Sequence, residues 1–529
     1  KLKMGNQGPF DMVIQEEEII RYQRAVSRLI CKLDRRLIPF LALLEIARFG
    51  FQVAIGLILI LVEHFSKKEF QMLTGHALLT TFKVDLDLTN EENNWTTSAF
   101  FIAYLIFAIP SSLILRLLGT TRYLSLSLIS WGAITIGMAF VTNARQVIIL
   151  RFFLGMVIAG YFPGIITYFS LWYPKREQIM RIAIFCTATF ASGALVGILA
   201  YASSKMNGIA NLKSWQWLFL LPGLPVIPIG IMTYLALGSI PETVQWLDNC
   251  EKQFLTNLLR QDSGVANSER ASDSLLSWRQ VWYVFVDWRM YLYATIIIGD
   301  LGGIKCLMTS LPSIMKGLHY SIEEAHLMTI IPYVISCFTI LLGGYSSSRR
   351  NEHAYHHVFF LCLGLLGFIL MITLEERGKL VMYVSVCIAC CGTFSALSIL
   401  WSWLTNNVGG NTKRTVAVGM MSGIGQIGAI IQPQVFSGED KPVSRRDHII
   451  ASGFLVGALI MTLILRYCLM MENRRRQYLS DDDYNREAAI EEPCDWVNIE
   501  DICCRQNWNL GKFRICPGKI GILILTRQN

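Results

Sequence analysis

The sequence predicts an all-α polytopic membrane protein with twelve transmembrane helices arranged in two six-helix bundles. Three observations support this fold class. Of the 529 residues, 53% are hydrophobic and only 16% are charged, whereas a soluble domain has about 25% charged residues. Apolar runs of about 20 residues, which is the length that crosses a bilayer core, recur along the chain. A hydrophilic break divides these runs into two sets of six.

The apolar runs set the expected helices and domains. The first six runs cover residues 37–62, 96–115, 123–142, 147–171, 181–203 and 216–238. The last six cover residues 289–311, 326–346, 355–374, 380–403, 415–436 and 449–471. We therefore expect an N-terminal bundle over 37–238 and a C-terminal bundle over 288–471. The remaining parts are an N-terminal segment over 1–36, a linker over 239–287 and a tail over 472–529.

The charges between the runs predict which side of the membrane each loop faces. Positive residues concentrate in cytoplasmic loops. If the helices alternate, one side carries Arg116, Arg122, Lys175, Arg176, Arg349, Arg350, Lys413 and Arg414, while the opposite loops are mixed or acidic. The N-terminal segment, the linker and the tail are therefore expected to be cytoplasmic. Apolar residues at helical spacing from Trp246 to Leu259 predict an amphipathic helix in the linker, followed by a flexible Ser-rich stretch.

This organisation is typical of a secondary transporter, with the substrate site at the midplane between the halves. A primary pump is not indicated, because no GxxxxGK[ST] stretch occurs. An enzyme is not expected either, since most of the 8 histidines are assigned to loops. The 14 scattered cysteines favour buried thiols, so no disulfide framework, metal or cofactor is expected. The net charge of +8 is spread between apolar runs, which disfavours a nucleic-acid partner. We expect a monomer in a lipid bilayer.

The stretch from Trp401 to Pro433 contains the most informative local pattern. An apolar segment ends in two asparagines and two glycines, and the basic pair Lys413 and Arg414 follows. The next apolar segment carries glycines at positions 419, 423, 425 and 428. Small residues let membrane helices approach closely. We therefore predict a tight basic turn followed by a helix that packs closely and bends.

Several blocks resemble the major facilitator superfamily and, within it, the anion:cation symporters of the fungal allantoate permease and nicotinic acid transporter family. The most specific are RFFLGMVIAGYFPGIITYFSLWYPKRE at 151–177 and SWLTNNVGGNTKR at 402–414, and others lie at 32–44, 93–119, 241–247 and 311–321. The resemblance implies the major facilitator fold. It also implies proton-coupled uptake at the plasma membrane of a small organic anion, namely a nicotinate-, ureide- or vitamin-like carboxylate, by alternating access.

The chain departs from the family pattern at four positions in three of the predicted membrane helices. Phe51 and Gln52 replace an Asp-Arg pair in the first helix, Ile158 replaces a glutamate in the fourth, and Pro222 replaces one in the sixth. Residues 57–84 form an unusual insertion, and the tail is also atypical. These losses keep two alternatives open, which are a nutrient sensor of the same fold that does not transport, and a degenerate paralogue.

The candidate site residues are ionisable or aromatic groups within the predicted spans. Ionisable groups inside a bilayer are costly and usually functional. We predict that Arg48 binds the substrate anion, because a guanidinium matches a carboxylate, and that Glu45, one turn away, tunes it. Asp300 is the best remaining acid for proton coupling, with Glu45 as a second. Lys305 lies about 140° around the same helix from Asp300, so the two are not expected to share a face.

Four further residues complete the predicted substrate site. They are Trp401, Gln426, Tyr161 and Tyr333, whose rings and amide suit stacking on and hydrogen bonding to a ring-containing substrate. Arg151 opens the fourth span. An arginine there either contributes to substrate or proton coupling or anchors the helix end at the membrane surface, and we favour the anchor.

Overall fold

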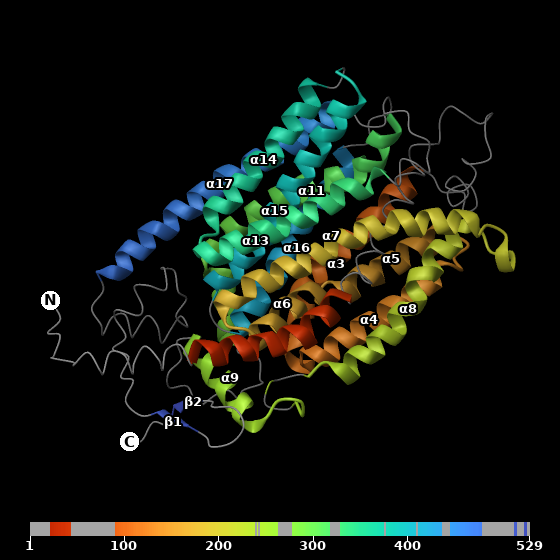
Figure 1. Cartoon of the computed structure of the whole chain (residues 1–529). Helices are drawn as coiled ribbons and strands as arrows, with labels where there is room; N and C mark the ends of the chain where they lie inside the picture. Colours follow the sequence, from red (N-terminus) through yellow and green to blue (C-terminus); the bar gives the residue numbers. More distant parts are fainter. Residues whose placement is uncertain are drawn as a thin grey trace, which may run out of the picture.

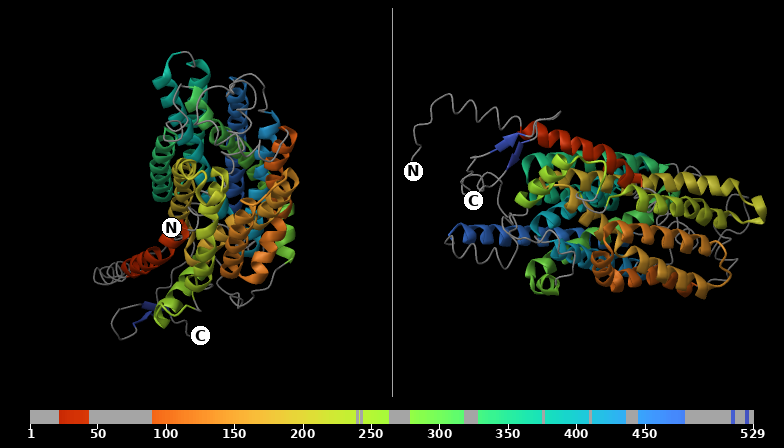
Figure 2. Two further views of the ribbon diagram at one scale, coloured as in Figure 1. Left: turned by 90° about the vertical axis from the view of Figure 1, so that its right-hand side faces the viewer. Right: turned by 90° about the horizontal axis from the view of Figure 1, so that it is seen from below.

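The computed structural model shows two groups of long helices lying side by side (Figure 1, Figure 2). It describes residues 22–43, 90–238, 241, 244–262, 278–317, 328–374, 377–408, 411–435, 445–478, 513–515 and 523–525. A helix over residues 22–43 precedes the first group. One end of the molecule carries the helix over 22–43, the linker helix α9 (Asn249–Asp262) and the last residues of α17 (Arg445–Gln477) (Figure 1). We call it the linker end.

The first group contains six labelled helices and a short 3-10 turn. They are α3 (Asn90–Leu118), α4 (Thr120–Met138), α5 (Ala144–Ile158), α6 (Tyr161–Trp172), α7 (Lys175–Lys205), η1 (Ile209–Asn211) and α8 (Ser214–Ala236). Within the group, α3 packs against α5 and α4 packs against α8. The approach of α4 and α8 is close, since a methyl group added to Gly132 would lie 2.7 Å from Ile227.

The second group contains the helices after the linker. They are α11 (Trp288–Gly317), α13 (Ile330–Arg350), α14 (Ala354–Thr373), α15 (Lys379–Asn407), α16 (Asn411–Val435) and α17 (Arg445–Gln477). Here α14 packs against α15 and α17, while α11 packs against α16 and α17. Between the groups lie α9 (Asn249–Asp262) and α10 (Trp278–Val286), and a short antiparallel ribbon near the chain end pairs β1 (Phe513–Ile515) with β2 (Leu523–Leu525).

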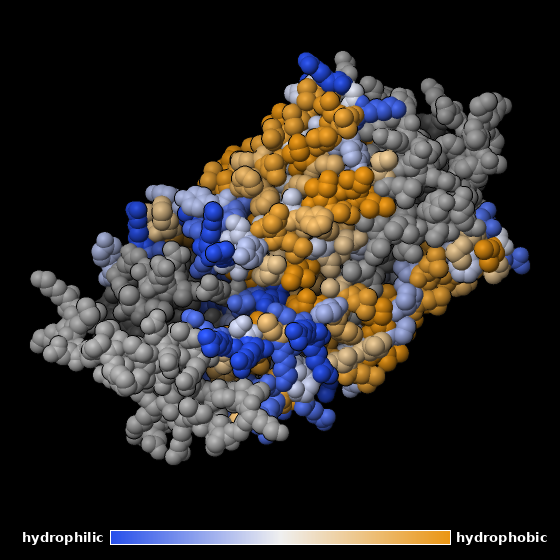
Figure 3. Space-filling model, in the orientation of Figure 1, coloured by the Kyte–Doolittle hydropathy of each residue, from blue (hydrophilic) through white to orange (hydrophobic). Residues whose placement is uncertain are grey.

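The outer surface of the helices matches a bilayer. In the part of the chain that the structure describes, 8 helices are long and apolar enough to cross a membrane. They cover Ser98–Leu118, Ala144–Trp172, Ser214–Ala236, Trp288–Met308, Ile330–Arg350, Ala354–Thr373, Lys379–Asn407 and Arg445–Arg475. Large side chains such as Phe338, Leu342 and Phe359 are more than 60% exposed, and Figure 3 shows hydrophobic side chains over the helices and hydrophilic ones near the linker end. Hydrocarbon rather than water covers such a surface.

A helix lies over each predicted span from 96–115 onward. The helices over 123–142, 181–203 and 415–436, which are α4, α7 and α16, are not among the 8 described helices that are long and apolar enough to cross a membrane. The structure differs from the prediction at three further places. The fourth span is divided, because α5 ends at Ile158 and α6 begins at Tyr161. The helix that leads into the first span already begins by residue 22, and the rest of that span lies outside the described residues. In the linker, α9 confirms the amphipathic helix, whereas α10 was not predicted.

Helix α16 packs closely against one helix of each group, and glycines make both contacts possible. On one face, a methyl group added to Gly423 would lie 2.7 Å from Ala108 Cβ of α3. On the other face, one added to Gly425 would lie 2.4 Å from Ile297 of α11. The prediction that this segment is a close-packing helix is therefore confirmed. The two groups also meet where α7 lies against α13 and α15, and where α6 lies against α16.

Replacing Gly423 by valine is expected to destabilise the protein by about 1–3 kcal/mol, because overpacking forces the backbones of α3 and α16 apart. Thermal unfolding in detergent measures the change. Gly453→Val on α17 is the control, since nothing lies within 4 Å of a methyl group added there. Equal melting temperatures for the two variants would contradict the close contact between α3 and α16.

Candidate functional site

Aromatic side chains from both groups stack where the two groups meet. The rings of Phe190 on α7 and Phe394 on α15 are 4.2 Å apart between centroids and 9° from parallel. Tyr333 on α13 also stacks on Phe394, at 5.8 Å and 17°. Three rings from three helices thus form one column across the boundary between the two groups. We call this boundary the seam.

A second aromatic contact crosses the seam further along α15. Trp401 lies 4.6 Å from Phe162 of α6, and Phe162 in turn lies 5.9 Å from Phe185 of α7. Trp401 is 4% exposed. Two residues predicted for the substrate site, Trp401 and Tyr333, are therefore brought to the same boundary, whereas Phe190 and Phe394 were not predicted.

Small polar groups lie beside the aromatic column. Ser395 on α15 donates a hydrogen bond to the hydroxyl oxygen of Thr339 on α13, at 3.0 Å. Across the seam, the Cys337 thiol lies 3.6 Å from the carbonyl oxygen of Thr187 on α7. Rings with a few polar groups between them are the usual lining of a small-molecule site.

The other predicted site residues are less clearly part of the seam. Gln426 on α16 is half-buried, and its side chain donates to the Ser422 carbonyl at 3.1 Å. Tyr161 is 1% exposed at the start of α6, inside the hydrophobic core. Arg48 and Glu45 lie outside the described residues. The predicted set is therefore only partly brought together by the residues that the structure describes.

Arg151 on α5 is buried, with 5% of its surface exposed. A snorkelling anchor keeps its guanidinium in water, so the prediction that Arg151 is an anchor is wrong. Its Nε and Nη2 atoms have no hydrogen-bond partner among the described residues. A buried charge without a partner is costly, which makes Arg151 a candidate for binding an anion.

A second cation, from the other group, lies near α3. The ammonium of Lys305 on α11 lies 5.1 Å from the centroid of the Phe101 ring. One turn after Arg151, Gly155 packs so closely on α3 that an added methyl group would lie 2.2 Å from the carbonyl oxygen of Phe100. Lys305 and the helix that carries Arg151 therefore reach α3 at adjacent residues, from opposite groups.

Asp300 points away from Lys305, into the second group, as the helical spacing predicted. Its Oδ2 lies 3.1 Å from Nε2 of His357 on α14, and both side chains are fully buried. The Nδ1 of His357 lies 3.1 Å from the hydroxyl of Thr462 on α17. Assigning most histidines to loops overlooked His357, although it falls within the predicted span 355–374 and that position was the available signal.

A buried ion cluster holds the linker end of the second group together. Asp287, between α10 and α11, accepts hydrogen bonds from Arg289 at 2.5 Å and from Lys413 of α16 at 3.1 Å. Burial alone would raise the pKa of Asp287, but the bonds and charges of these two cations lower it below its ordinary value. Lys413 belongs to the SWLTNNVGGNTKR block, so this block has a structural role.

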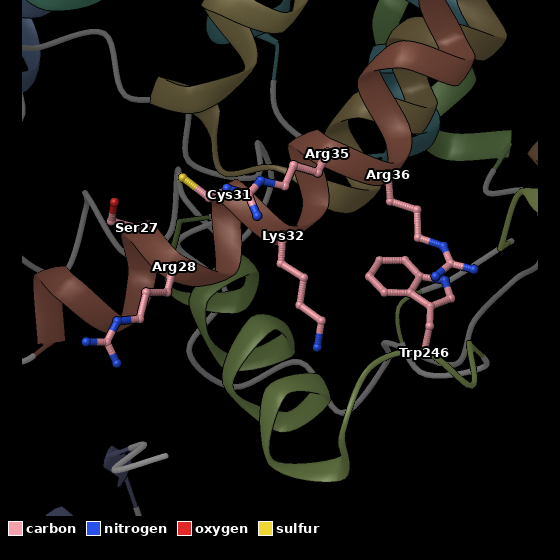
Figure 4. A pocket seen from close by; sticks show the side chains of 7 residues that line it. All are labelled: Ser27, Arg28, Cys31, Lys32, Arg35, Arg36 and Trp246. Carbon is pink, nitrogen blue, oxygen red and sulfur yellow. The ribbon is translucent and has the colours of Figure 1, made fainter. Parts of the chain in front are cut away.

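A basic surface pocket of about 620 Å³ lies apart from the seam, between the helix over 22–43 and the linker (Figure 4). The Arg36 guanidinium lies 5.0 Å from the centroid of the Trp246 ring, and Lys32 forms an ion pair with Glu251 of α9 at 2.6 Å. Trp246 also stacks on Trp172 of α6 at 5.7 Å. These contacts fasten the linker to the first group.

Two helical groups, an apolar outer surface and an aromatic seam between the groups define a multi-pass membrane protein of the transporter class. Comparison with known families identifies it further. The Major Facilitator Superfamily model matches residues 44–433, and the chain belongs to this superfamily. Its members are membrane transporters rather than enzymes, and they bind small molecules.

Individual relatives and solved structures agree with this family. The chain is 29% identical to the MFS transporter prlL of Fungal sp. (strain NRRL 50135), over 90% of this chain and 92% of the relative. It is 27% identical to a putative tartrate transporter of Agrobacterium vitis, over 83% and 91%. The proton:xylose symporter XylE has the same fold, with a TM-score of 0.62, 14% identity and coverage of 80% of this chain and 95% of that one.

Replacing Asp287 by asparagine is expected to cost about 3–5 kcal/mol at neutral pH, because two buried cations lose their counter-charge. The folded pKa of Asp287 is lowered, so its stabilisation is present above the ordinary aspartate value and is lost as the pH falls through the folded value. Melting temperatures of the wild type and the variant should therefore converge only in acid.

Glu472→Gln is the matched control, because Glu472 pairs with Arg475 on the exposed end of α17 at 2.8 Å. Such a surface pair contributes about 0–1 kcal/mol. A loss as large as that of Asp287→Asn, or a constant difference between wild type and Asp287→Asn at all pH values, would count against the buried cluster.

Proposed function

We propose that this chain takes up a small organic anion, a nicotinate-, ureide- or vitamin-like carboxylate, by proton symport and alternating access. It acts as a monomer in the plasma membrane, with both termini in the cytoplasm. The basic loops support this orientation, since positive residues concentrate on the cytoplasmic side. The blocks that resemble the allantoate permease and nicotinic acid transporter family support the substrate class, as does similarity to a relative named a putative tartrate transporter.

The seam supports a planar substrate. Trp401 and Tyr333 present rings from the second group, and Phe190 and Phe162 approach them from the first. A flat carboxylated ring entering between them would gain stacking contacts and replace the ring-to-ring contacts that now cross the seam. Gln426 and Tyr161 supply the proposed hydrogen bonds to its polar edge.

The cations support a negative charge on the substrate. The observation that carries the proposal is the buried Arg151 guanidinium, two of whose nitrogens have no hydrogen-bond partner among the described residues. A guanidinium binds a carboxylate with two parallel hydrogen bonds. Lys305 lies over the Phe101 ring of α3, the helix on which α5 packs, and Arg48 remains the proposed third cation. Asp300 and Glu45 are the proposed proton carriers.

The packing of α16 supports alternating access. Gly419 and Gly423 let α16 approach α3 of the first group, while Gly425 and Gly428 let it approach α11 of its own group. The Thr415 hydroxyl near the linker end of α16 lies 2.9 Å from the Thr167 hydroxyl of α6. This hydrogen bond and the contact between Gly423 and Ala108 belong to the type of small-residue interface along which two bundles rock.

Arg151→Ala is expected to reduce saturable uptake of labelled nicotinate at least about tenfold, because a charge-assisted hydrogen bond to a carboxylate contributes about 1.5–3 kcal/mol. Arg151→Lys should retain only part of the activity, since an ammonium cannot bind in the bidentate manner. The assay uses cells without their own carrier and a panel of nicotinate, allantoate and tartrate.

Arg145→Ala is the control, because Arg145 lies on the same helix and is exposed. Its uptake should equal that of the wild type. The same assay tests Arg48→Ala, which is expected to abolish uptake. Wild-type uptake of some panel anion together with unchanged uptake by Arg151→Ala would overturn the role of Arg151. Saturable binding without accumulation would favour the nutrient sensor, and neither binding nor uptake would favour the degenerate paralogue.

Proton symport predicts that uptake rises several-fold when the external pH is lowered with the internal pH held constant, because the proton gradient then drives entry of the anion. The measurement compares initial uptake rates at two external pH values, with and without a protonophore that collapses the gradient. A rate that responds to neither change would exclude proton coupling while leaving uptake itself intact.

A further inference from the structure

The carboxyl of Asp300 and the imidazole of His357 share a site that no water reaches. Both side chains are 0% exposed, and their closest atoms are 3.1 Å apart. Asp300 comes from α11, His357 from α14 and Thr462 from α17, so three helices of the second group converge on the site. Because an isolated ion in such surroundings is costly, the pair is most stable when its net charge is zero.

Thr462 determines which nitrogen of His357 carries a proton. The Thr462 hydroxyl donates its only hydrogen to the Ala458 carbonyl oxygen, at 2.7 Å. The same hydroxyl lies 3.1 Å from His357 Nδ1, and with its hydrogen used it can only accept there. Therefore His357 Nδ1 is the donor, and it carries a hydrogen in every protonation state of the site.

This assignment leaves one proton to be shared between His357 Nε2 and Asp300 Oδ2. If the proton is on Oδ2, a carboxylic acid donates to a neutral imidazole. If it is on Nε2, an imidazolium donates to a carboxylate, and both forms have zero net charge. Loss of the proton leaves a carboxylate beside a neutral imidazole. A second proton has a place on Asp300 Oδ1, which has no hydrogen-bond partner among the described residues.

We propose that Asp300 and His357 form a single proton-binding site in the second group, with Thr462 as its positioning residue, and that this site couples proton movement to transport. The coupling step rests on the proposed proton symport, whereas the shared proton rests on the geometry alone. The proposal adds His357 and Thr462 to the acid predicted from the sequence, and it places the proton outside the substrate seam.

Two packed helices connect this site with the seam. The ring of Trp403 lies 6.5 Å from that of His357, and Trp403 is on α15, which also carries Trp401 of the seam. On α11, Asp300 faces His357 while Lys305 faces Phe101 of the first group. A change of charge at Asp300 therefore acts on the two helices that present Trp401 and Lys305 to the first group.

Other titratable groups on the surrounding helices have partners elsewhere. On α11 the Tyr293 hydroxyl accepts from Asn407, and the Cys306 thiol lies near the Asp447 carbonyl. Around α14, His353 forms a hydrogen bond with Asn406, and His356 forms one with Ser346.

The same holds for α17 and α15. On α17, Arg466 pairs with Glu352 and lies over the Tyr355 ring, and the His448 ring lies near Phe368. On α15, Cys390 is buried and Cys391 lies near Ser336. None of these contacts involves Asp300 or His357.

The first test measures the shared proton without any substrate. Infrared difference spectra of the full-length protein in lipid are recorded from about pH 4 to about pH 9, a range that brackets the ordinary values of both groups. A carboxyl band should titrate together with an imidazole band. Asp300→Asn should remove both changes, and His357→Gln should move the carboxyl midpoint by at least about one pH unit. Thr462→Val should shift the same midpoint while leaving the bands present.

His356→Gln is the matched control, since His356 is the adjacent residue on α14 and bonds Ser346 instead. It should leave the carboxyl titration unchanged. A carboxyl band in wild type that is absent from Asp300→Asn but titrates identically in His357→Gln would overturn the shared site. A spectrum in which neither the Asp300 carboxyl nor the His357 imidazole changes between these pH values would overturn it as well.

The second test measures coupling in proteoliposomes with labelled nicotinate as the probe. Asp300→Asn and His357→Gln should lose gradient-driven accumulation at least about fivefold, but should keep exchange of internal for external nicotinate, which needs no net proton movement. Accumulation like that of the wild type in both variants would overturn the coupling role. If the wild type itself moves no nicotinate, the proposed substrate fails, while the infrared result still decides the proton site.

Discussion

An ionised side chain loses several kcal/mol of hydration when it leaves water, and this constraint determines how charge is arranged in the described helices. At the linker end the charges neutralise each other, as Asp287 does with Arg289 and Lys413. Within the spans the solutions differ: Asp300 shares a proton with His357, and Arg151 keeps unpaired donors. Asp300 and Arg151, whose charge is not neutralised by a fixed ion pair among the described residues, are the side chains to which we assign roles in transport.

The helices themselves were largely predictable, because a bilayer admits only backbone that is hydrogen-bonded internally and the apolar runs therefore mark the spans. Errors arose where tertiary packing decides. In the run 147–171, Gly160 and Pro163 were the available signals for the interruption after Ile158, because proline has no N–H to continue the preceding helix, and Gly160 lies close to Tyr123. Helix α10 was missed because the Ser-rich composition before it suggested a flexible connection.

The site was predicted only in part, for a physical reason. Trp401 and Tyr333 could be found because a ring inside a span is conspicuous, yet their stacking partners Phe190 and Phe394 look like ordinary packing residues. Arg151 was taken for an anchor because its depth depends on how α5 lies against α3. His357 becomes meaningful only beside Asp300 and Thr462, which come from distant parts of the chain.

The glycines of α16 have a consequence for how the protein can be tuned. Those at 419 and 423 contact the first group, whereas those at 425 and 428 contact α11 within the second. Enlarging the former would force the two bundles apart, which costs stability and also changes the relative population of the two access states. Enlarging the latter would disturb the packing within the second bundle itself. Only the first pair of glycines therefore links helix packing to turnover.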